Sequence, residues 1–487
     1  SELANWRRKN LLQMESYDFD EGFGRLIDGK LEDVDTLELR RLATYVGMNE
    51  HTTATIDKLD EEAYASVQRA LITVAAEGAD AERGRFALRL LANVGQRSER
   101  HAGALPVSVL PSIRDLLMGS RHVPECAALL TMAAGELAKT AALDQNLDTI
   151  VATVGHLWMS VEDDGTRSWL SAFVARLLEV DGAFLANAFG ELPSTAFTNL
   201  LHITEALCDG MVMGARADGE FRMHPNNAQM LLDIVRRAHY DYTDEAREGP
   251  STTTSSSSTR FLPEYPNQLP LLLGCIASLA TRRNLFGEVL QREGNEALVE
   301  CIVEMLDVTL HSEGNLQRAE ETGEEEERRP EDRPQRAPAF ESPRVRSSPS
   351  LSRMAAAFCE DASVQRAKER IGAMKCAAVR AIGNLAAECA SSRIRAGSSG
   401  AVVLCLAAAR RRDHDDAFVT QWSIAALRYL CLGCPENQEI LAAIDSAPTG
   451  IIDRDGLLAQ LGLRVVTVEE QEDGAAGPKK RAKLMPL

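Results

Sequence analysis

The two closest cysteines in this sequence, Cys431 and Cys434, have the spacing of a metal-binding or redox pair. A structural zinc site needs four ligands, and a redox pair usually lies between a strand and a helix. The sequence supplies no second close cysteine pair, and the nearest histidine, His414, precedes the apolar run in which the pair lies. We therefore interpret both thiols as core residues and expect no metal site.

No other group of residues has the spacing of a known catalytic or cofactor site. The nine histidines are scattered, and none belongs to an HExxH sequence. Phosphate-binding loops of the GxxxxGK[ST] and GxGxxG types are missing, and so is the GxSxG sequence of serine hydrolases. The sequence thus predicts a protein that is not an enzyme and carries no cofactor.

Two polar segments could be recognised by other proteins. Ser347 and Ser348 follow two arginines and precede Pro349, so a kinase could modify them. After Pro478, a basic run resembles a nuclear import signal, although a basic solubilising tail has the same composition. That run comprises Lys479, Lys480, Arg481 and Lys483.

Composition restricts the class of protein further. The chain has 487 residues, a net charge of −19 and 45% hydrophobic residues, which is ordinary for a globular protein. Such an acidic balance disfavours nucleic acid as the main ligand, because phosphate binding needs a cationic face. The longest apolar stretch, Leu269–Ala280, is too short to cross a bilayer. Most cysteines lie in apolar runs, as expected in a reducing compartment, so we predict a cytoplasmic protein without membrane partners.

Apolar residues recur at helical spacing throughout, as at Phe86, Leu90 and Val94. Three segments, 86–105, 377–396 and 425–444, each begin with the pattern Ala, aliphatic, Arg, and the first two place Asn93 or Asn384 four residues after the arginine. A weaker fourth copy spans 273–306, with Ser278 in the asparagine position. We expect each Asn or Ser to bond the backbone of the turn that follows it.

Stacked helical repeats follow from this pattern, because no single copy can bury its own apolar face. A period near 40 residues is typical of armadillo and HEAT repeats. The predicted fold class is therefore an all-α, right-handed, armadillo or HEAT-like solenoid. Strand-like alternation is confined to a short segment, Arg464–Val468.

Composition also divides the chain. We expect helical blocks over 1–242, 269–310 and 353–470. Between them, a Ser/Thr-rich linker at 243–268 and an acidic, Pro-rich insert at 311–352 lack the apolar residues needed to fold, and so does a basic tail at 471–487.

The C-terminal block resembles a known family in one specific stretch. Phe418 and Gln421-Trp422-Ser423-Ile424 are followed by Ala426-Leu427-Arg428 and then by Pro435-Glu436-Asn437-Gln438. With the helix at 374–396 before it and LLAQLGLRVVTVEE after it, this order is similar to the C-terminal domain of the ataxin-10 family. Ala417 and Tyr429 depart from that pattern, since the family usually has Pro and Asn there.

The resemblance implies a non-enzymatic, armadillo-like scaffold that binds other proteins in the cytoplasm and associates with itself through the C-terminal block. In the animal family it also implies roles in cell division and in neuron maintenance. The candidate contact residues are Phe418, Trp422, Arg428, Glu436, Asn437 and Gln438. For Trp422 we favour a core position over a surface anchor, because a tryptophan in an apolar stripe is usually buried. An alternative function is regulation of a GTPase or another nucleotide-handling partner.

Overall fold

The structure is a computed structural model. It describes residues 25, 35–48, 56, 61–77, 81–97, 109–140, 145–210, 221–244, 265–290, 292, 295–324, 342–359, 363–410, 417–446, 463–470 and 479–486. The chain forms two compact units, Ser1–Asn227 and Ala228–Leu487. Nearly all described residues are helical, and the predicted fold class, an all-α armadillo or HEAT-like solenoid, is confirmed.

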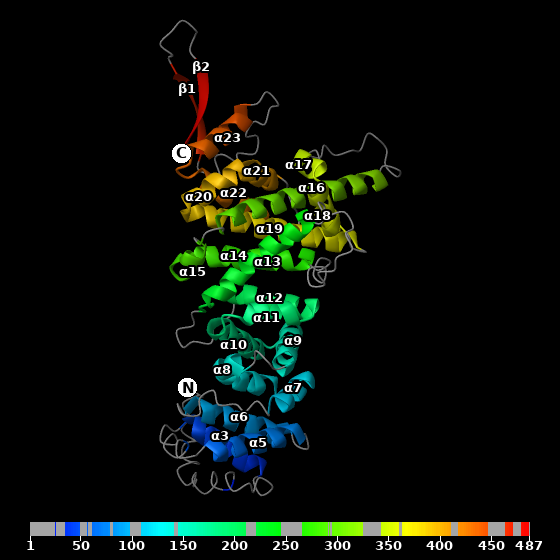
Figure 1. Cartoon of the computed structure of the whole chain (residues 1–487), viewed down its shortest axis with the longest axis vertical. Helices are drawn as coiled ribbons and strands as arrows, with labels where there is room; N and C mark the ends of the chain where they lie inside the picture. The colour runs from blue at the N-terminus through cyan, green and yellow to red at the C-terminus, as the bar shows by residue number, and fades with distance from the viewer. Residues whose placement is uncertain are drawn as a thin grey trace, which may run out of the picture. The chain divides into compact units, whose positions relative to one another are not determined.

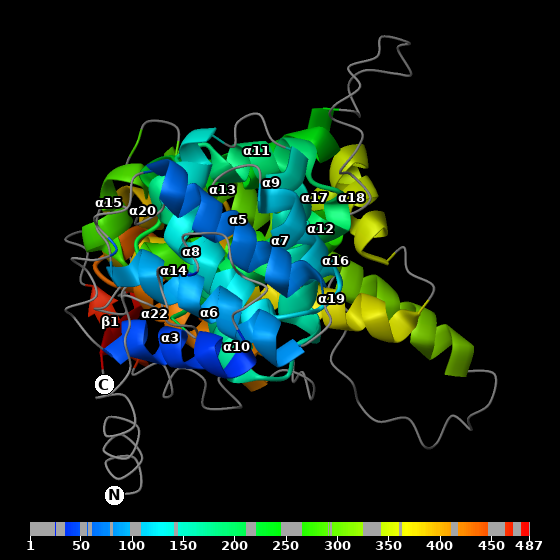
Figure 2. The same cartoon turned by 90° about the horizontal axis from the view of Figure 1, so that it is seen from below.

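The first unit is built from short antiparallel and crossed helices (Figure 1). They are α3 (Thr36–Met48), α5 (Glu61–Glu77), α6 (Ala81–Arg97), α7 (Leu110–Met118), α8 (Val123–Thr140), α9 (Gln145–Ser160), α10 (Asp164–Val180), α11 (Phe184–Glu191) and α12 (Ser194–Cys208). Helices far apart in sequence pack together, so that α3 lies beside α6 (Figure 2), α8 against α10, and α9 against α12.

Local sequence explains these helices. Phe86, Leu90 and Val94 all lie in the core, as their spacing predicts. The N-terminus of α10 is capped by Asp163, whose carboxylate accepts a hydrogen bond of 2.6 Å from the amide of Thr166. The burial of one apolar stripe per helix supplies the stabilisation that such short helices lack on their own.

The second unit contains the remaining helices and a β-hairpin. They are α13 (Pro225–Asp244), whose first turn belongs to the first unit, α14 (Tyr265–Thr281), α15 (Arg283–Leu290), the 3₁₀ helix η5 (Asn295–Ala297), α16 (Leu298–Glu324), α17 (Pro343–Ser347), α18 (Pro349–Cys359), α19 (Val364–Glu388), α20 (Ala390–Ser398), α21 (Ala401–Arg410), α22 (Ala417–Cys431), α23 (Pro435–Ser446), β1 (Leu463–Glu470) and β2 (Lys479–Pro486).

The centre of this unit is a row of three helices in which α19 lies between α14 and α22 (Figure 1). The apolar stretch Leu269–Ala280 is buried along its whole length in α14, with Pro270 inside the helix. It is thus a core helix. Within the described residues, no helix is both long and apolar enough to cross a membrane.

The repeat inferred from sequence corresponds to a structural layer. The copy at 377–396 spans the end of α19 and most of α20, and Gly400 then separates α20 from α21 with a φ of +99°. Glycine adopts this left-handed conformation without the steric cost that a side chain brings. The next copy begins in α22, so one layer consists of a long helix followed by two short ones.

The prediction that the repeat asparagines bond the backbone of the turn that follows them is wrong. Asn384 on α19 donates to the carbonyl of Ala277 on α14 at 2.9 Å, and Asn93 on α6 donates to that of Ala43 on α3 at 2.7 Å. Both side chains reach a neighbouring helix rather than the following turn. Ser278 instead donates to the carbonyl of Gly274, one turn back in its own helix, at 3.1 Å.

The boundaries predicted for the insert at 311–352 are wrong at both ends. Residues up to Glu324 continue α16, and residues from 343 form α17 and part of α18. His311, Ser312, Val345 and Leu351 are buried. Composition averaged over the whole insert hid these few buried positions. Residues 325–341 lie outside the described part.

The linker and tail predictions are wrong in their outer parts. Residues 243–244 belong to α13 and 265–268 to α14, while 245–264 lie outside the described residues. In the tail, β2 pairs antiparallel with β1, in a register that places Glu469 opposite Lys480. The strand expected at Arg464–Val468 is therefore present as part of β1. Residues 471–478 and 487 lie outside the described residues.

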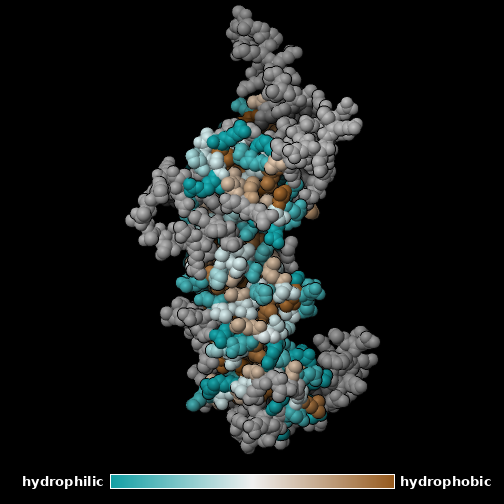
Figure 3. Space-filling model, turned by 90° about the vertical axis from the view of Figure 1, so that its right-hand side faces the viewer, coloured by the Kyte–Doolittle hydropathy of each residue, from teal (hydrophilic) through white to brown (hydrophobic). Residues whose placement is uncertain are grey.

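The surface shows no single dominant apolar area among the described residues of the face drawn in Figure 3, where hydrophobic and hydrophilic residues are interspersed. Large exposed hydrophobic side chains occur singly on several helices, for example Met118 on α7 and Tyr240 on α13. On α22 two of them lie one turn apart, and this pair forms the centre of the candidate site.

Candidate protein-interaction site

Two aromatic side chains of α22 are exposed. Phe418 is 63% and Trp422 is 37% accessible, although apolar residues on the other side of the helix, among them Val419 and Leu427, are buried. The prediction that Trp422 is a core residue is therefore wrong. The helix buries its opposite side against α19 and α21, which leaves Trp422 at the margin of the packed surface.

Trp422 is accompanied by a cation from the next helix. The guanidinium carbon of Arg380, on α19, lies 5.8 Å from the centroid of the indole ring. The same guanidinium donates to the hydroxyl of Ser278 and, at 3.5 Å, to the carbonyl of Gly274, both on α14. Arg380 is thus held by α14 while it stacks on α22. A cation–π contact of this kind contributes roughly 0.5–1 kcal/mol near the surface.

We call the exposed side of this helix the α22 face, made of Phe418, Gln421, Trp422 and Arg428. All four residues are exposed, and helical geometry places them within one third of the helix circumference. The face has two aromatic rings, one amide and one cation, and it carries no acidic side chain. Exposed Trp, Phe and Arg are the side chains enriched at protein–protein contacts.

The other three predicted contact residues are on α23, away from this face. Asn437 is 1% accessible, and its amide nitrogen donates to the carbonyls of Leu430 at 2.8 Å and Arg393 at 3.1 Å. Gln438 donates to the carbonyl of Cys431 at 2.8 Å. These bonds satisfy the carbonyls left unpaired at the end of α22. Glu436 is exposed in the first turn of α23.

Asn437 and Gln438 are therefore structural residues that join α22, α20 and α23. A methyl group added at Gly397, on α20, would lie 1.7 Å from the side-chain oxygen of Asn437. The amide thus occupies the space that a side chain at 397 would need. The sequence signal for this packing was the glycine itself, whose role depends on a residue forty positions away.

The close cysteine pair is buried, as predicted. Burial raises the pKa of Cys431 to about 12, and it also raises that of Cys434. The nearby thiol of Cys405 has its pKa raised to about 12 by burial and by Cys431. These thiols are protonated at neutral pH, a form that neither binds zinc nor attacks an electrophile. Among the described residues, no group of three or more His, Cys, Asp or Glu could hold a metal ion.

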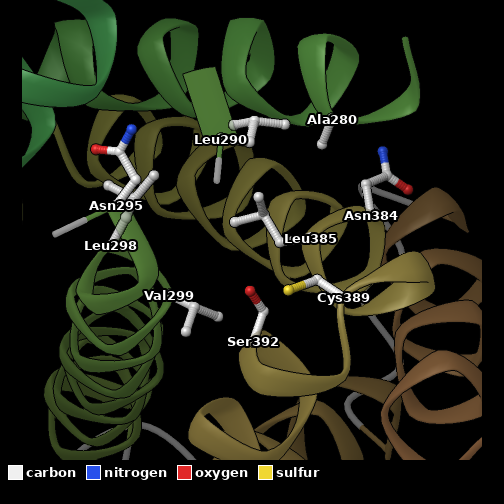
Figure 4. Close-up of a pocket in the computed structure, with 9 residues that line it drawn as sticks. All are labelled: Ala280, Leu290, Asn295, Leu298, Val299, Asn384, Leu385, Cys389 and Ser392. Carbon is white, nitrogen blue, oxygen red and sulfur yellow. The ribbon is translucent and has the colours of Figure 1, made fainter. Parts of the chain in front are cut away.

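A small pocket lies where α14, α16, α19 and α20 meet (Figure 4). Cys389 and Ser392 face the same space there. Burial opposes ionisation of the thiol, but hydrogen bonds from Ser391 and Ser392 outweigh it and lower the pKa of Cys389. The opposite wall is largely aliphatic, with Leu298 and Val299. A single activated thiol without a partner base does not make a catalytic site.

The predicted modification sites are accessible. Ser347 is exposed at the end of α17, and Ser348 is half-buried just before α18. A further serine, Ser342, was not predicted as a site; it is 2% accessible and caps the N-terminus of α17. The signal available in the sequence was the dipeptide Ser342-Pro343, a standard helix start.

The basic segment predicted as an import signal lies in strand β2. Lys479 is opposite Glu470 and Lys480 is opposite Glu469 in the hairpin register, and Arg481 and Lys483 lie opposite valines. The segment is thus paired with β1 rather than continuing as a separate tail.

The stacked helices define the class of protein, an α-helical repeat protein. The family model of the Spinocerebellar ataxia type 10 protein domain matches residues 374–476. This match supports the predicted resemblance of the C-terminal block to the ataxin-10 family. The match includes the α22 face, Arg380 and all of α23.

Over its whole length the chain has only low similarity to the solved structures described next. No curated protein matches the sequence. A crystal structure of SYS-1 is 11% identical over 88% of this chain and 62% of that chain, with a TM-score of 0.29. A structure from work on the interaction of cadherin and beta-catenin is 13% identical over 81% of this chain and 82% of that one, with a TM-score of 0.27. Scores this low carry no argument about this chain.

Proposed function

We propose that the protein is a non-enzymatic scaffold that binds other proteins, and that its α22 face is a contact surface. The observation that carries this proposal is the exposure of two aromatic side chains one turn apart, Phe418 and Trp422, beside the guanidinium of Arg380. An anchored arginine stacked on an indole loses little further conformational freedom when a partner binds.

The occupant we favour is a second copy of the chain, as the family resemblance implies for the C-terminal block. The α22 face combines two aromatic rings that can pack against the same rings of another copy. The resemblance further supports roles in cell division and cell maintenance, which we include in the proposal.

Self-association can be tested on the full chain by light scattering over a range of concentrations. We expect Phe418→Ala combined with Trp422→Ala to lower the average mass toward that of the monomer. The matched control is Trp169→Ala on α10, because Trp169 is exposed to 39% and lies in the other unit. A wild-type chain that is monomeric at every concentration would exclude self-association, and equal masses for both variants would exclude this face.

We also propose that the protein is cytoplasmic and enters the nucleus by means of the basic segment in β2. Fluorescent full-length chains with and without alanine at Lys479, Lys480, Arg481 and Lys483 test this proposal. A nuclear fraction unchanged by the four substitutions would exclude the segment as a signal.

A further inference from the structure

The short helix α17 is attached to α16 by an unusual set of buried polar contacts. The hydroxyl of Ser342 donates to Oδ2 of Asp307 at 2.8 Å, and its backbone amide lies 3.3 Å from Nδ1 of His311. The same hydroxyl accepts a hydrogen bond from the amide of Val345 at 3.2 Å. Asp307 and Ser342 are 6% and 2% accessible, so water cannot easily replace these bonds.

One turn further, charged groups complete the attachment. Arg344 of α17 pairs with Oε1 of Glu304, on α16. The other carboxylate oxygen of Glu304 lies 2.5 Å from Nε2 of His239, on α13. Between these polar contacts, Val345 is fully buried. The segment of α17 therefore acts as a strap, held at one end by a serine hydroxyl that must remain a hydrogen-bond donor.

We propose that Ser342 is a phosphorylation site and that its modification releases the α17 strap from α16. Pro343 follows it directly, which is the feature read by proline-directed protein kinases. The γ-phosphoryl group of a nucleoside triphosphate is transferred to Oγ of Ser342. A new O–P bond forms there, the bond to the nucleoside diphosphate breaks, and the hydroxyl proton passes to solvent through the kinase.

Charge explains the release. The phosphate replaces a neutral donor by a group with nearly two negative charges, at a position in contact with the carboxylate of Asp307. The lost hydrogen bond and the repulsion both act in a poorly hydrated place, where unpaired charges are most costly. In the closed form, Arg344 is already paired with Glu304.

The kinase reaches the buried Ser342 because the α17 strap opens and closes in a conformational equilibrium. The strap helix has only five residues, and a segment with so few contacts opens locally far more often than the whole unit unfolds. The kinase binds the open form, and phosphorylation prevents the strap from closing again. The modification thus shifts the population toward a state that exposes one side of α16.

The neighbouring serines provide an internal comparison. Ser347 is exposed at the other end of α17, and its hydroxyl donates to the carbonyl of Arg344 at 3.1 Å rather than to a carboxylate. A negative charge there meets the arginines of α17 without an acidic partner in contact. A negative charge at position 342 should therefore release α17 from α16, whereas the same charge at position 347 should not.

Trypsin cleavage after Arg344 and Arg346 of the folded full chain measures release. We expect Ser342→Asp to speed this cleavage about 10-fold or more, because aspartate retains the ability to cap α17 but opposes Asp307. Ser347→Asp should change the rate less than twofold. Adding Asp307→Asn to Ser342→Asp should restore slow cleavage. Equal rates for the two aspartate variants, or no restoration by Asp307→Asn, would overturn the proposal.

Modification itself is tested on the wild-type full chain with a proline-directed kinase and ATP, followed by mass spectrometry. We expect phosphate on Ser342, and faster tryptic cleavage in the phosphorylated fraction. A Ser347→Ala, Ser348→Ala chain leaves Ser342 as the only serine followed by proline within 342–352 and should behave in the same way. Failure to label Ser342 in that chain, or labelling without faster cleavage, would contradict the proposal.

Discussion

Single residues determine whether the helices of the C-terminal block can meet. Gly397 leaves room for the amide of Asn437, which donates to the carbonyls of Arg393 in α20 and of Leu430 at the end of α22. The two positions are therefore coupled, because a side chain at 397 and the amide at 437 cannot occupy the same space. A buried amide with several bonds is also costly to remove, since its partners lose a donor in a place that water does not reach.

This coupling predicts a non-additive pair of substitutions. We expect Gly397→Ala and Asn437→Ala each to reduce the free energy of unfolding by about 1–3 kcal/mol. The double variant should cost clearly less than the sum, because Asn437→Ala removes the atom with which the new methyl group collides. Urea denaturation of the four chains measures the cycle, and strictly additive losses would show that the collision does not occur.

A second residue-scale prediction concerns His239. Burial opposes protonation of this side chain, but hydrogen bonds to Cys301 and Glu304 outweigh it and raise its pKa to about 9 from 6.5. The charged form thus stabilises the folded state fully below pH 6.5, and this stabilisation is lost as the pH rises through about 9. The loss should be on the order of 2 kcal/mol.

Unfolding free energies at pH 6 and pH 9.5 measure this effect, with His239→Gln as the variant. The variant should lose most of the difference between the two pH values. His156→Gln on α9, whose side chain is exposed, is the control and should retain the wild-type difference. A pH dependence that is the same in all three chains would contradict the assignment.

At the scale of elements, the spacing between helices in the central row depends on small residues. A Cβ atom at Gly383 of α19 would lie 3.0 Å from the Cα atom of Ala426 on α22. That neighbour is backbone and cannot rotate away. Asn384 adds a hydrogen bond from α19 to α14 on the other side. The middle helix is thus fixed against both neighbours, and with it the orientation of Arg380 toward Trp422.

We therefore expect Gly383→Val to separate α19 from α22 and to lower the free energy of unfolding by roughly 1–3 kcal/mol. Gly372→Val, on the same helix, has nothing within 4 Å of the added Cβ and should be close to neutral. Thermal unfolding followed by circular dichroism compares the two. An equal loss in both variants would mean that helix propensity, rather than the close approach to α22, is responsible.

At the scale of the whole molecule, the most closely packed pairs of described helices, such as α14 with α19 and α8 with α10, each lie within one unit. In repeat proteins of this kind, stability is approximately a sum of layers and nearest-neighbour interfaces. Damage to one layer should therefore stay local. The chain contains a suitable pair of sites, since a Cβ at Gly155 on α9 would lie 3.0 Å from Cβ of Asn199 on α12, in the first unit.

Hydrogen exchange of the full chain tests this locality. Gly383→Val should speed exchange in α19 and α22 while leaving α9 and α12 unchanged, and Gly155→Val should do the reverse. The two variants control for each other, because each is measured in both units. Faster exchange in all four helices of either variant would show that the molecule unfolds as one cooperative body.

Much of this fold could be predicted from the sequence because its signals are local. Apolar spacing within one helix located the buried stripe of α6. The family resemblance at 418–438 indicated the block that carries the candidate site. These features depend on residues within a few turns of one another.

Tertiary structure alone decided which side chains are exposed at the surface and which are buried. Trp422 is exposed because α19 and α21 cover the other side of α22, and Asn437 is buried because α20 and the end of α22 surround it. Ser342 became the strap contact because Asp307 lies opposite it after 35 residues of intervening chain. Local patterns determine where apolar stripes lie, whereas exposure and pairing depend on which distant helices come to cover them.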